Sequence, residues 1–192
     1  MTPQDVLDFW FLTASHEGHG KPRDEWFRKD AAFDAAITDR FGTLIALAVG
    51  GGLREWDEQG PEGTLARIVV LDQFTRNSAR GTPAAFAGDA LALAAARKLV
   101  DSGAHLALTP VQRSFAYMPF EHAEDAAMQE ISVRLFNELS EENSGFESAM
   151  DYAHRHRAVI ARFSRFPHRN PILGRASTPE ELEYLSQPGS GF

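Results

Sequence analysis

Repeated helix starts are the feature that most constrains the fold of this chain. Thr2-Pro3, Thr109-Pro110 and Thr178-Pro179 each place a capping hydroxyl before a proline, a pair that suits the first turn of an α-helix. After these starts, apolar residues recur every three or four positions, which is the spacing of one helical face. No run of alternating apolar and polar residues and no Asn-Gly hairpin signal stands out. The sequence therefore predicts an all-α fold.

A helix that begins near Pro61 is predicted to be the central, buried one, because apolar residues surround it on nearly every side. Asp72 and Arg76 form an i,i+4 pair of opposite charge on this helix, and Asn77 and Arg80 follow them. A charge pair in a dry environment is costly to form and contributes little net stability. A brace between helices and a functional role both stay open for this pair.

The stretch from 152 to 175 holds six arginines and three of the seven histidines but no acidic residue, in a chain of formal net charge -8. Its first part is predicted to be a helix with His156 on the apolar face and with Arg155 and Arg162 pointing away. A histidine on that face loses its water, so its ring nitrogens need partners. His156 is then either a core histidine bonded to a carbonyl or carboxylate, or a group that transfers protons or contacts a ligand.

The loop that follows carries three polar residues, His168, Arg169 and Asn170, between Pro167 and Pro171. The two prolines stop the helix and stiffen the connection. Polar side chains on a rigid loop suit the binding of a ligand. The alternative is that Arg169 and Asn170 only tie down neighbouring helix ends.

Acidic residues gather between 121 and 125. Pro119 is expected to bend or break the chain before them, and a helix is predicted from Glu121 to Leu139. Negative charge in its first turn is favoured by the helix dipole. Alternatively, Glu121 or Asp125 is the counter-charge for the arginines of 155–175. No H-E-x-x-H or comparable ligand spacing is present, so no metal site is predicted.

Length and composition limit the remaining possibilities. The 192 residues suit a single helical domain over 1–187 with a flexible tail at 188–192. The absence of cysteine excludes disulfides, thiolate nucleophiles and cysteine-bound metals. No apolar run approaches the ~20 residues that span a bilayer, and no signal peptide is evident, so a soluble, cytoplasmic protein without a membrane partner is expected. The acidic net charge argues against unspecific binding of nucleic acid. No phosphate loop or dinucleotide fingerprint occurs, and no cofactor is predicted.

Several short motifs together resemble a bacterial domain-of-unknown-function family, number 924. The motifs span nearly the whole chain: Trp26-Phe27, Leu71-Asp72-Gln73-Phe74, Arg80-Gly81-Thr82-Pro83, Glu121-His122-x-Glu124-Asp125 and Arg165-Phe166-Pro167-His168-Arg169-Asn170 with Leu173-Gly174-Arg175. Thr75 stands where the family usually has proline, and Ser164 where glycine is frequent. The resemblance implies a tetratricopeptide-repeat-like array of helical hairpins and brings no established activity. A 34-residue repeat is not evident in the sequence itself.

Three functional hypotheses follow. The first is a binding protein whose helical cup presents arginines and histidines to an anionic ligand, a phosphate or carboxylate group, or to a peptide. The second is a metal-independent hydrolase of a phosphorylated or acylated small molecule with a histidine as general acid/base. The third treats the polar residues as internal braces and places the function on an outer surface that contacts a partner protein. The predicted site residues are Asp72, Arg76, Asn77, Arg80, Glu121, His122, His156, His168, Arg169 and Asn170.

Overall fold

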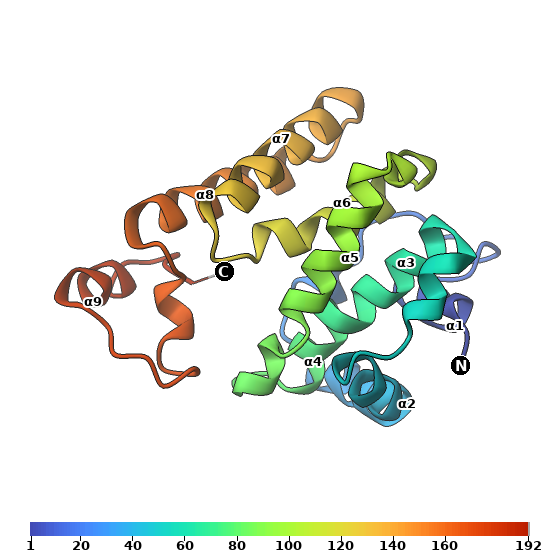
Figure 1. Cartoon of the computed structure of the whole chain (residues 1–192), viewed down its shortest axis with the longest axis horizontal. Coiled ribbons are helices and arrows are strands. Elements are labelled where there is room, and N and C mark those ends of the chain that lie inside the picture. The colour runs from blue at the N-terminus through green and yellow to red at the C-terminus, as the bar shows by residue number, and fades with distance from the viewer. Residues whose placement is uncertain (192) are drawn as a thin grey trace. The chain divides into compact units, whose positions relative to one another are not determined.

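The computed structural model describes residues 1–191, and every regular element in that range is helical, which confirms the all-α prediction. Figure 1 follows these elements along the chain by colour. The α-helices are α1 (Pro3–Phe11), α2 (Ala31–Val49), α3 (Pro61–Ile68), α4 (Thr75–Ser78), α5 (Asp89–Asp101), α6 (Pro110–Glu121), α7 (Ala126–Glu142), α8 (Glu147–Phe163) and α9 (Pro179–Leu185). Short 3-10 turns lie at Asp24–Trp26, Arg54–Gln59, Pro83–Phe86, Ala104–Ala107 and Pro167–Arg169. Within the described residues, no helix combines the length and the apolar character needed to cross a bilayer.

The predicted helix starts are formed as expected. Thr2 and Thr178 both form capping boxes. In each, the threonine hydroxyl accepts from the backbone N–H of the third helical residue, and the carboxylate of that residue accepts from the threonine N–H. At α6, Thr109 N donates to Gln112 Oε1 at 3.0 Å, and Gln112 N donates to Thr109 Oγ1 at 3.4 Å. These caps satisfy N–H groups that no helix can satisfy internally.

A π-helical segment, η3 (Val69–Phe74), connects α3 to α4 and makes the central helix wider at its middle. The sequence predicts the burial of this helix, and every residue of η3 is buried, but its periodicity does not reveal the π turn. Such segments inside α-helices are rare and occur frequently at functional sites. Gly88 lies directly against it, because a Cβ atom at Gly88 would sit only 2.1 Å from the Leu71 carbonyl oxygen.

The chain divides into two compact units. The first contains Met1–Arg80 and Ala84–Pro119, and the second contains Gly81–Pro83 and the chain from Phe120 onward. The predicted single domain over 1–187 with a flexible tail stays a prediction. Of that tail, Gly189 accepts a hydrogen bond from Arg155 Nη2 at 3.1 Å, and Phe192 lies outside the described residues.

Aromatic side chains form the core of the first unit. The Trp10 ring lies 5.6 Å from the Phe74 ring, and Phe74 lies 4.8 Å from Phe41. On the other side of the cluster, the Trp26 ring packs edge-on against Phe115 at 4.7 Å. These rings come from separate helices, so their burial joins α1, α2, η3 and α6.

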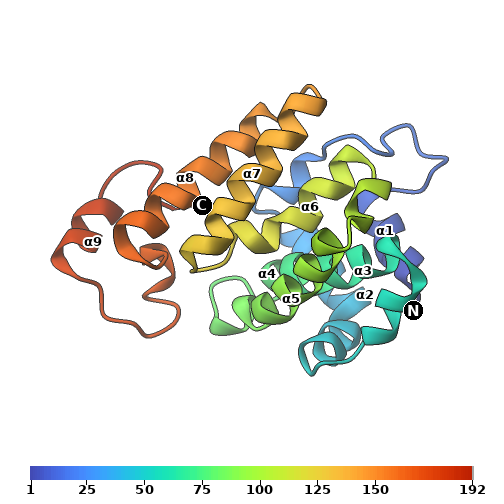
Figure 2. The ribbon, with the colours of Figure 1, turned by 45° about the horizontal axis from the view of Figure 1, so that its top comes forward.

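In the second unit, α7 and α8 lie side by side as an antiparallel hairpin (Figures 1 and 2). Val159, Ile160 and Phe166 form a buried cluster at the C-terminal end of α8, with Phe163 and Tyr184 packed against it. This cluster supports the loop that carries the Phe-Pro-His-Arg-Asn motif, because Phe166 belongs to both.

For residues 119–125, a break of the chain at Pro119 and a helix that starts at Glu121 are both wrong. Helix α6 passes through Pro119 and ends at Glu121, and the Gln129 amide caps its end by donating to the carbonyls of Phe120, Glu121 and Ala123. Helix α7 begins after Asp125, whose carboxylate accepts from Met128 N at 3.0 Å. Because Asp125 has extended backbone angles, the acidic residues before it lie outside the first turn and are available for other contacts.

Candidate functional site

In the first unit, Arg76 bonds to two carboxylates. Its Nη1 donates to Asp89 Oδ1 at 2.8 Å and lies 3.1 Å from Asp72 Oδ1, while Nη2 donates to Asp89 Oδ2 at 3.1 Å. The Asp72 carboxylate also accepts from Gln73 Nε2 at 2.6 Å. Burial acts to lower the pKa of Arg76, but the charges of Asp72 and Asp89 outweigh it and raise the pKa. The Asp72–Arg76 pair exists as predicted, and Asp89 joins it as a partner that the sequence did not reveal.

Asn77 and Arg80 share one carboxylate, Asp34 of α2. Arg80 Nε and Nη2 donate to its two oxygens at 2.8 and 2.9 Å, and Asn77 Nδ2 donates to Oδ1 at 2.8 Å. Burial acts to raise the pKa of Asp34, but the hydrogen bonds from Arg80 and Asn77 lower it below its usual value. This bidentate pairing ties the end of α4 to α2, which is the arrangement of a structural brace.

In the second unit, His156 lies on the buried face of α8. Its Nδ1 is 2.8 Å from the Tyr152 carbonyl oxygen, one turn earlier, and 3.5 Å from Glu121 Oε1. A carbonyl oxygen can only accept, so Nδ1 carries the hydrogen and donates it. The His156 and Glu121 side chains are 5% and 9% exposed, so both lie away from bulk water.

The imidazole of His156 is neutral around pH 7. Burial is the main cause that lowers the pKa of His156 from 6.5 to about 3, and the positive charges of Arg169 and of the protonated forms of His122 and His168 act in the same direction. The hydrogen bond to Tyr152 opposes this shift. With Nδ1 protonated and the ring neutral, Nε2 carries the lone pair and can accept a hydrogen bond or a proton.

Arg169 is a buried cation in the same unit, with only 6% of its surface exposed. Its Nη2 donates to the His122 carbonyl oxygen at 3.1 Å, and its guanidinium carbon lies 4.6 Å from the centre of the Phe166 ring. The Phe166 ring also contacts the His156 ring edge-on at 5.4 Å. Phe166 therefore supports both the cation and the histidine, and the guanidinium gains a cation–π contact.

His122 and His168 are the partly exposed members of this group. The His168 ring lies 5.7 Å from Phe166, and the His122 ring lies 6.3 Å from His156. Burial and the charge of Arg169 lower the pKa of His168 from 6.5 to about 4, although Glu124 acts against them. Around pH 7 the His168 ring is therefore neutral as well.

Asn170 belongs to a bracing network. Its Nδ2 donates to Ser177 Oγ at 3.0 Å and to Glu181 Oε2 at 3.2 Å, and its Oδ1 accepts from Arg175 Nε at 2.9 Å. Arg165 donates to both oxygens of Glu181 at 2.6 and 2.8 Å, and these bonds are the main cause that lowers the pKa of Glu181 to about 2. The network contains four charged residues that are not among the predicted site residues: Glu124, Arg165, Arg175 and Glu181. The signal that could have found them is that an arginine-rich stretch without acids must draw its counter-charges from other segments.

The ten predicted site residues are divided between the two units. Asp72, Arg76, Asn77 and Arg80 belong to the first unit, and the other six belong to the second. Within the second unit, Glu121, His122, His156, His168 and Arg169 are joined through the contacts above, and we call these five residues the His/Arg cluster. The expectation that all ten meet in one hollow stays a prediction.

The chemistry of the His/Arg cluster is that of a polar binding site or of a proton-transfer site. One guanidinium can donate hydrogen bonds to an anion, and neutral imidazoles can both donate and accept. Among residues 1–191, no three histidine or carboxylate side chains are gathered as they would be around a metal ion.

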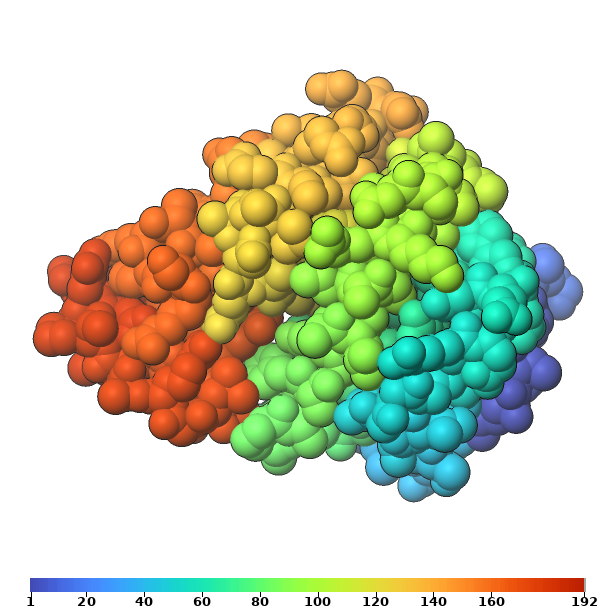
Figure 3. All heavy atoms as spheres, viewed as in Figure 1, coloured from blue at the N-terminus to red at the C-terminus, as the bar shows by residue number. Residues whose placement is uncertain are grey.

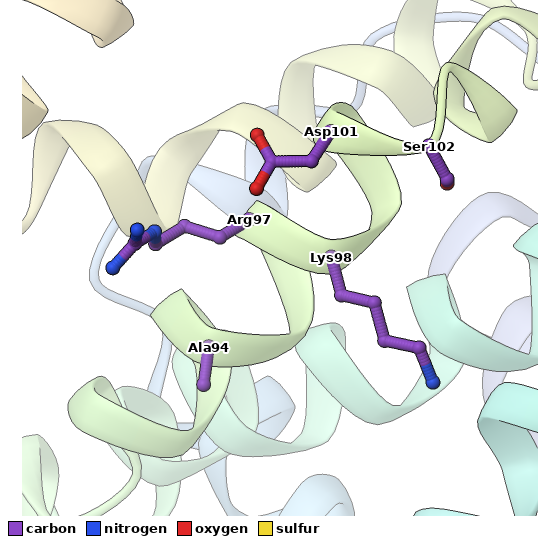
Figure 4. A pocket seen from close by; sticks show the side chains of 5 residues that line it. All are labelled: Ala94, Arg97, Lys98, Asp101 and Ser102. Atoms are coloured by element: carbon purple, nitrogen blue, oxygen red, sulfur yellow. The ribbon is translucent and has the colours of Figure 1, made fainter.

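Two surface hollows lie elsewhere, both in the first unit. One is lined by α5 residues, and Figure 4 shows that Arg97 and Lys98 extend from the helix in different directions instead of converging. Figure 3 shows the outer side of α5 at the surface. The other hollow is lined by Thr2, Pro3, Gln4, Leu7, Gln59, Glu62 and Gly63. Neither hollow contains a predicted site residue.

Comparison with known proteins places the chain among relatives without an assigned activity. The model of a family described as bacterial protein of unknown function (DUF924) matches residues 6–189. The fold is similar to that of the protein of unknown function ATU0120 from Agrobacterium tumefaciens, with 40% sequence identity and a TM-score of 0.82 over 95% of this chain and 96% of that chain. No curated protein shows significant similarity to the sequence.

Proposed function

Because the chain belongs to the DUF924 family, whose description names no activity, we propose a function from the His/Arg cluster itself: the protein binds an anionic ligand through Arg169. The ligand is a small molecule with a carboxylate or phosphate group, or a peptide that carries one. We propose the cytoplasm as its setting and a tetratricopeptide-repeat-like stacking of the helices, which the α7–α8 hairpin supports.

The observation that carries this proposal is a buried guanidinium among neutral imidazoles. Arg169 is 6% exposed, and its charge helps to lower the pKa of both His156 and His168. Burial is the larger cause of both shifts, and the positive charge of Arg169 adds to it. The same positive charge would attract an anion. His122 and His168 supply the partly exposed side from which a ligand would enter.

Substitution of Arg169 tests the proposal. Binding of inorganic phosphate and of acetate would be measured by titration calorimetry for the wild type, Arg169→Ala and Arg169→Lys. Arg169→Ala should lose about tenfold or more in affinity, because charge-assisted hydrogen bonds to the anion disappear, whereas Arg169→Lys should retain part of the binding. Circular dichroism would report the helicity of each variant.

The matched control is Arg162→Ala. Arg162 Nε pairs with Glu180 Oε1 at 2.9 Å, and both side chains are about half-exposed, so this change removes an arginine of the same unit at the surface. Its anion affinity should stay at the wild-type value. A wild type that binds neither probe contradicts the proposal, and so does loss of the fold in both Arg169 variants.

The alternative function is a metal-independent hydrolase, and one observation favours it. The Nδ1–H of His156 is held by the Tyr152 carbonyl beside Glu121, which leaves Nε2 as the basic nitrogen. Hydrolysis of p-nitrophenyl phosphate and p-nitrophenyl acetate would be compared in the wild type, His156→Gln and His168→Gln. The alternative requires a rate that falls in at least one variant. Equal rates in all three proteins would remove it.

The third possibility, a structural or interaction protein, is favoured by the first unit. Arg76 donates hydrogen bonds to Asp89, and Arg80 donates hydrogen bonds to Asp34. Ion pairs of this kind connect elements of the fold. Under this alternative, replacement of Arg169 by an uncharged residue would change the stability of the protein but not its affinity for phosphate or acetate.

A further inference from the structure

Arg175 lies outside the His/Arg cluster but bonds to the loop that carries two of its members, His168 and Arg169. Its Nη1 and Nη2 donate to the two oxygens of Glu124 at 2.6 and 2.9 Å. Nη2 also donates to the Phe166 carbonyl oxygen at 3.1 Å, and Nε donates to Asn170 Oδ1 at 2.9 Å. One guanidinium thus contacts both ends of the segment that contains His168 and Arg169.

Glu124, the ion-pair partner of Arg175, also bonds to the loop itself. Its Oε1 accepts from the backbone N–H of Phe166 at 2.7 Å, while the same carboxylate is held by Arg175. Phe166 therefore has both its N–H and its C=O bonded to this ion pair. The pair thus holds the backbone that precedes His168, together with the bond from Arg169 N to the Phe166 carbonyl at 3.1 Å.

The same short linker that contains Glu124 also supplies a hydrogen-bond acceptor to Arg169. Arg169 Nη2 donates to the carbonyl of His122, two residues before Glu124. The contact of Arg169 with His122 therefore joins the same linker and loop region that the Glu124–Arg175 pair joins. A second ion pair, Arg165 with Glu181, also holds Asn170, because Glu181 Oε2 accepts from both Arg165 Nη2 and Asn170 Nδ2.

We propose that Arg175, acting through Glu124, Phe166 and Asn170, is a positioning residue that presents Arg169 and His168 to the anionic ligand. This inference rests on the proposed anion binding. Binding groups held in the productive geometry before the ligand arrives cost less to order, so the clamp raises affinity without touching the ligand. A lysine cannot replace it, because its point charge cannot form the two parallel bonds to Glu124 together with the bonds to the loop.

The experiment compares the wild type with Arg175→Met, Arg175→Lys and Glu124→Gln, with Arg162→Met as the matched control. Two measurements are made on each folded protein. The first is the dissociation constant for inorganic phosphate. The second is the NMR spectrum, without ligand, of the His168 ring and of the Arg169 Nε–H, whose chemical shifts report changes in their surroundings.

We expect Arg175→Met, Arg175→Lys and Glu124→Gln each to weaken phosphate binding about tenfold, since misplacement of a binding group by a fraction of an ångström has effects of this size. The His168 and Arg169 signals should move in all three variants and stay in place in Arg162→Met. A merely structural role would lower the unfolding temperature but leave those two signals where they are in the wild type.

Each result decides one of the two claims. If the wild type binds no phosphate but the signals of His168 and Arg169 move in Arg175→Lys, the proposed ligand class fails and the positioning role stands. If the wild type binds phosphate and Arg175→Lys binds it equally well with unchanged signals, the positioning role is overturned. Loss of the fold in Arg175→Met, Arg175→Lys and Glu124→Gln alike would also overturn it, because the residues would then act on folding alone.

Discussion

At the scale of single residues, the local partners decide what each polar side chain can do. His156 and Arg76 both lie in buried surroundings, but their chemistry differs. Arg76 forms salt bridges with the carboxylates of Asp72 and Asp89, and these negative charges compensate its positive charge. His156 has a carbonyl and a neighbouring carboxylate, and burial keeps its ring neutral with a lone pair on Nε2. The first environment favours a brace, and the second is compatible with binding or proton transfer.

Ser164 is a non-glycine residue whose backbone adopts strained, left-handed angles. It follows the last residue of α8 with φ 58° and ψ 5°, the left-handed region, and its N–H donates to the Ile160 carbonyl at 2.8 Å. Helices commonly end with glycine in this conformation, because a Cβ atom there meets backbone atoms. The left-handed angle at Ser164 therefore suits the glycine that the resemblance leads us to expect at this position.

We predict that Ser164→Gly stabilises the protein by about 0.5–1 kcal/mol, since the relief of left-handed strain exceeds the added entropy of the unfolded chain. Urea unfolding followed by circular dichroism would measure the change. Ser164→Ala is the control and should not stabilise, because it keeps the Cβ atom. A lower unfolding free energy for the glycine variant would show that the serine side chain matters more than the backbone angle.

At the scale of elements, the central helix depends on one close approach that only glycine allows. Gly88 precedes α5 and lies against the carbonyl of Leu71 in the π segment η3. The π turn widens the helix at the position of Asp72, so the placement of that carboxylate depends on the contact between η3 and the start of α5. Neither the π turn nor its glycine neighbour follows from the helical periodicity of the sequence.

Replacement of Gly88 by alanine should be clearly destabilising. The new Cβ would lie 2.1 Å from a backbone oxygen, so η3 and α5 must separate. We expect a loss of about 1–3 kcal/mol, as for other overpacked positions. Gly42 of α2 is the matched control, since a Cβ there meets nothing within 4 Å, and Gly42→Ala should stabilise by about 0.5–1 kcal/mol. Equal unfolding free energies for the two alanine variants would refute the role of the close approach.

At the scale of the whole molecule, the abundant arginines connect segments that are distant in sequence. Asp34 and Arg80 are 46 residues apart, and Glu124 and Arg175 are 51 residues apart, yet both pairs form two parallel hydrogen bonds. Such bidentate pairing suits the planar guanidinium group better than the ammonium of lysine. The excess of arginine over lysine therefore has a structural use in both units.

The pH dependence of stability is a property of the whole chain, and His156 and His168 contribute to it below pH 6.5. The pKa values of His156 and His168 are about 3 and about 4 in the folded protein, against 6.5 in an unfolded chain. Because both are depressed, the stability that they contribute is complete above pH 6.5 and is lost as the pH falls toward their folded values. Each histidine should remove up to ~1.4 kcal/mol of unfolding free energy per pH unit in that interval.

Urea unfolding at about pH 7.5 and about pH 5 would measure this loss, in a range above the usual carboxylate pKa values. The double variant His156→Gln, His168→Gln should show a flatter profile than the wild type. An unfolding free energy that stays constant in the wild type over this range would contradict the burial of neutral rings.

The sequence by itself determined where α1, α3, α6 and α9 begin, because threonine caps and prolines act through their nearest neighbours, and it determined the all-α class, because helical periodicity is a local property. It also selected His156, His168 and Arg169 as notable polar groups. Only the tertiary structure decided which carboxylate each cation meets, that Pro119 stays inside α6, and that η3 is a π turn. These features depend on contacts between segments that lie tens of residues apart, and such contacts leave no periodic pattern in a single chain. Arg175 belongs to the same class, since its importance is visible only once Glu124, Phe166 and Asn170 are placed around it.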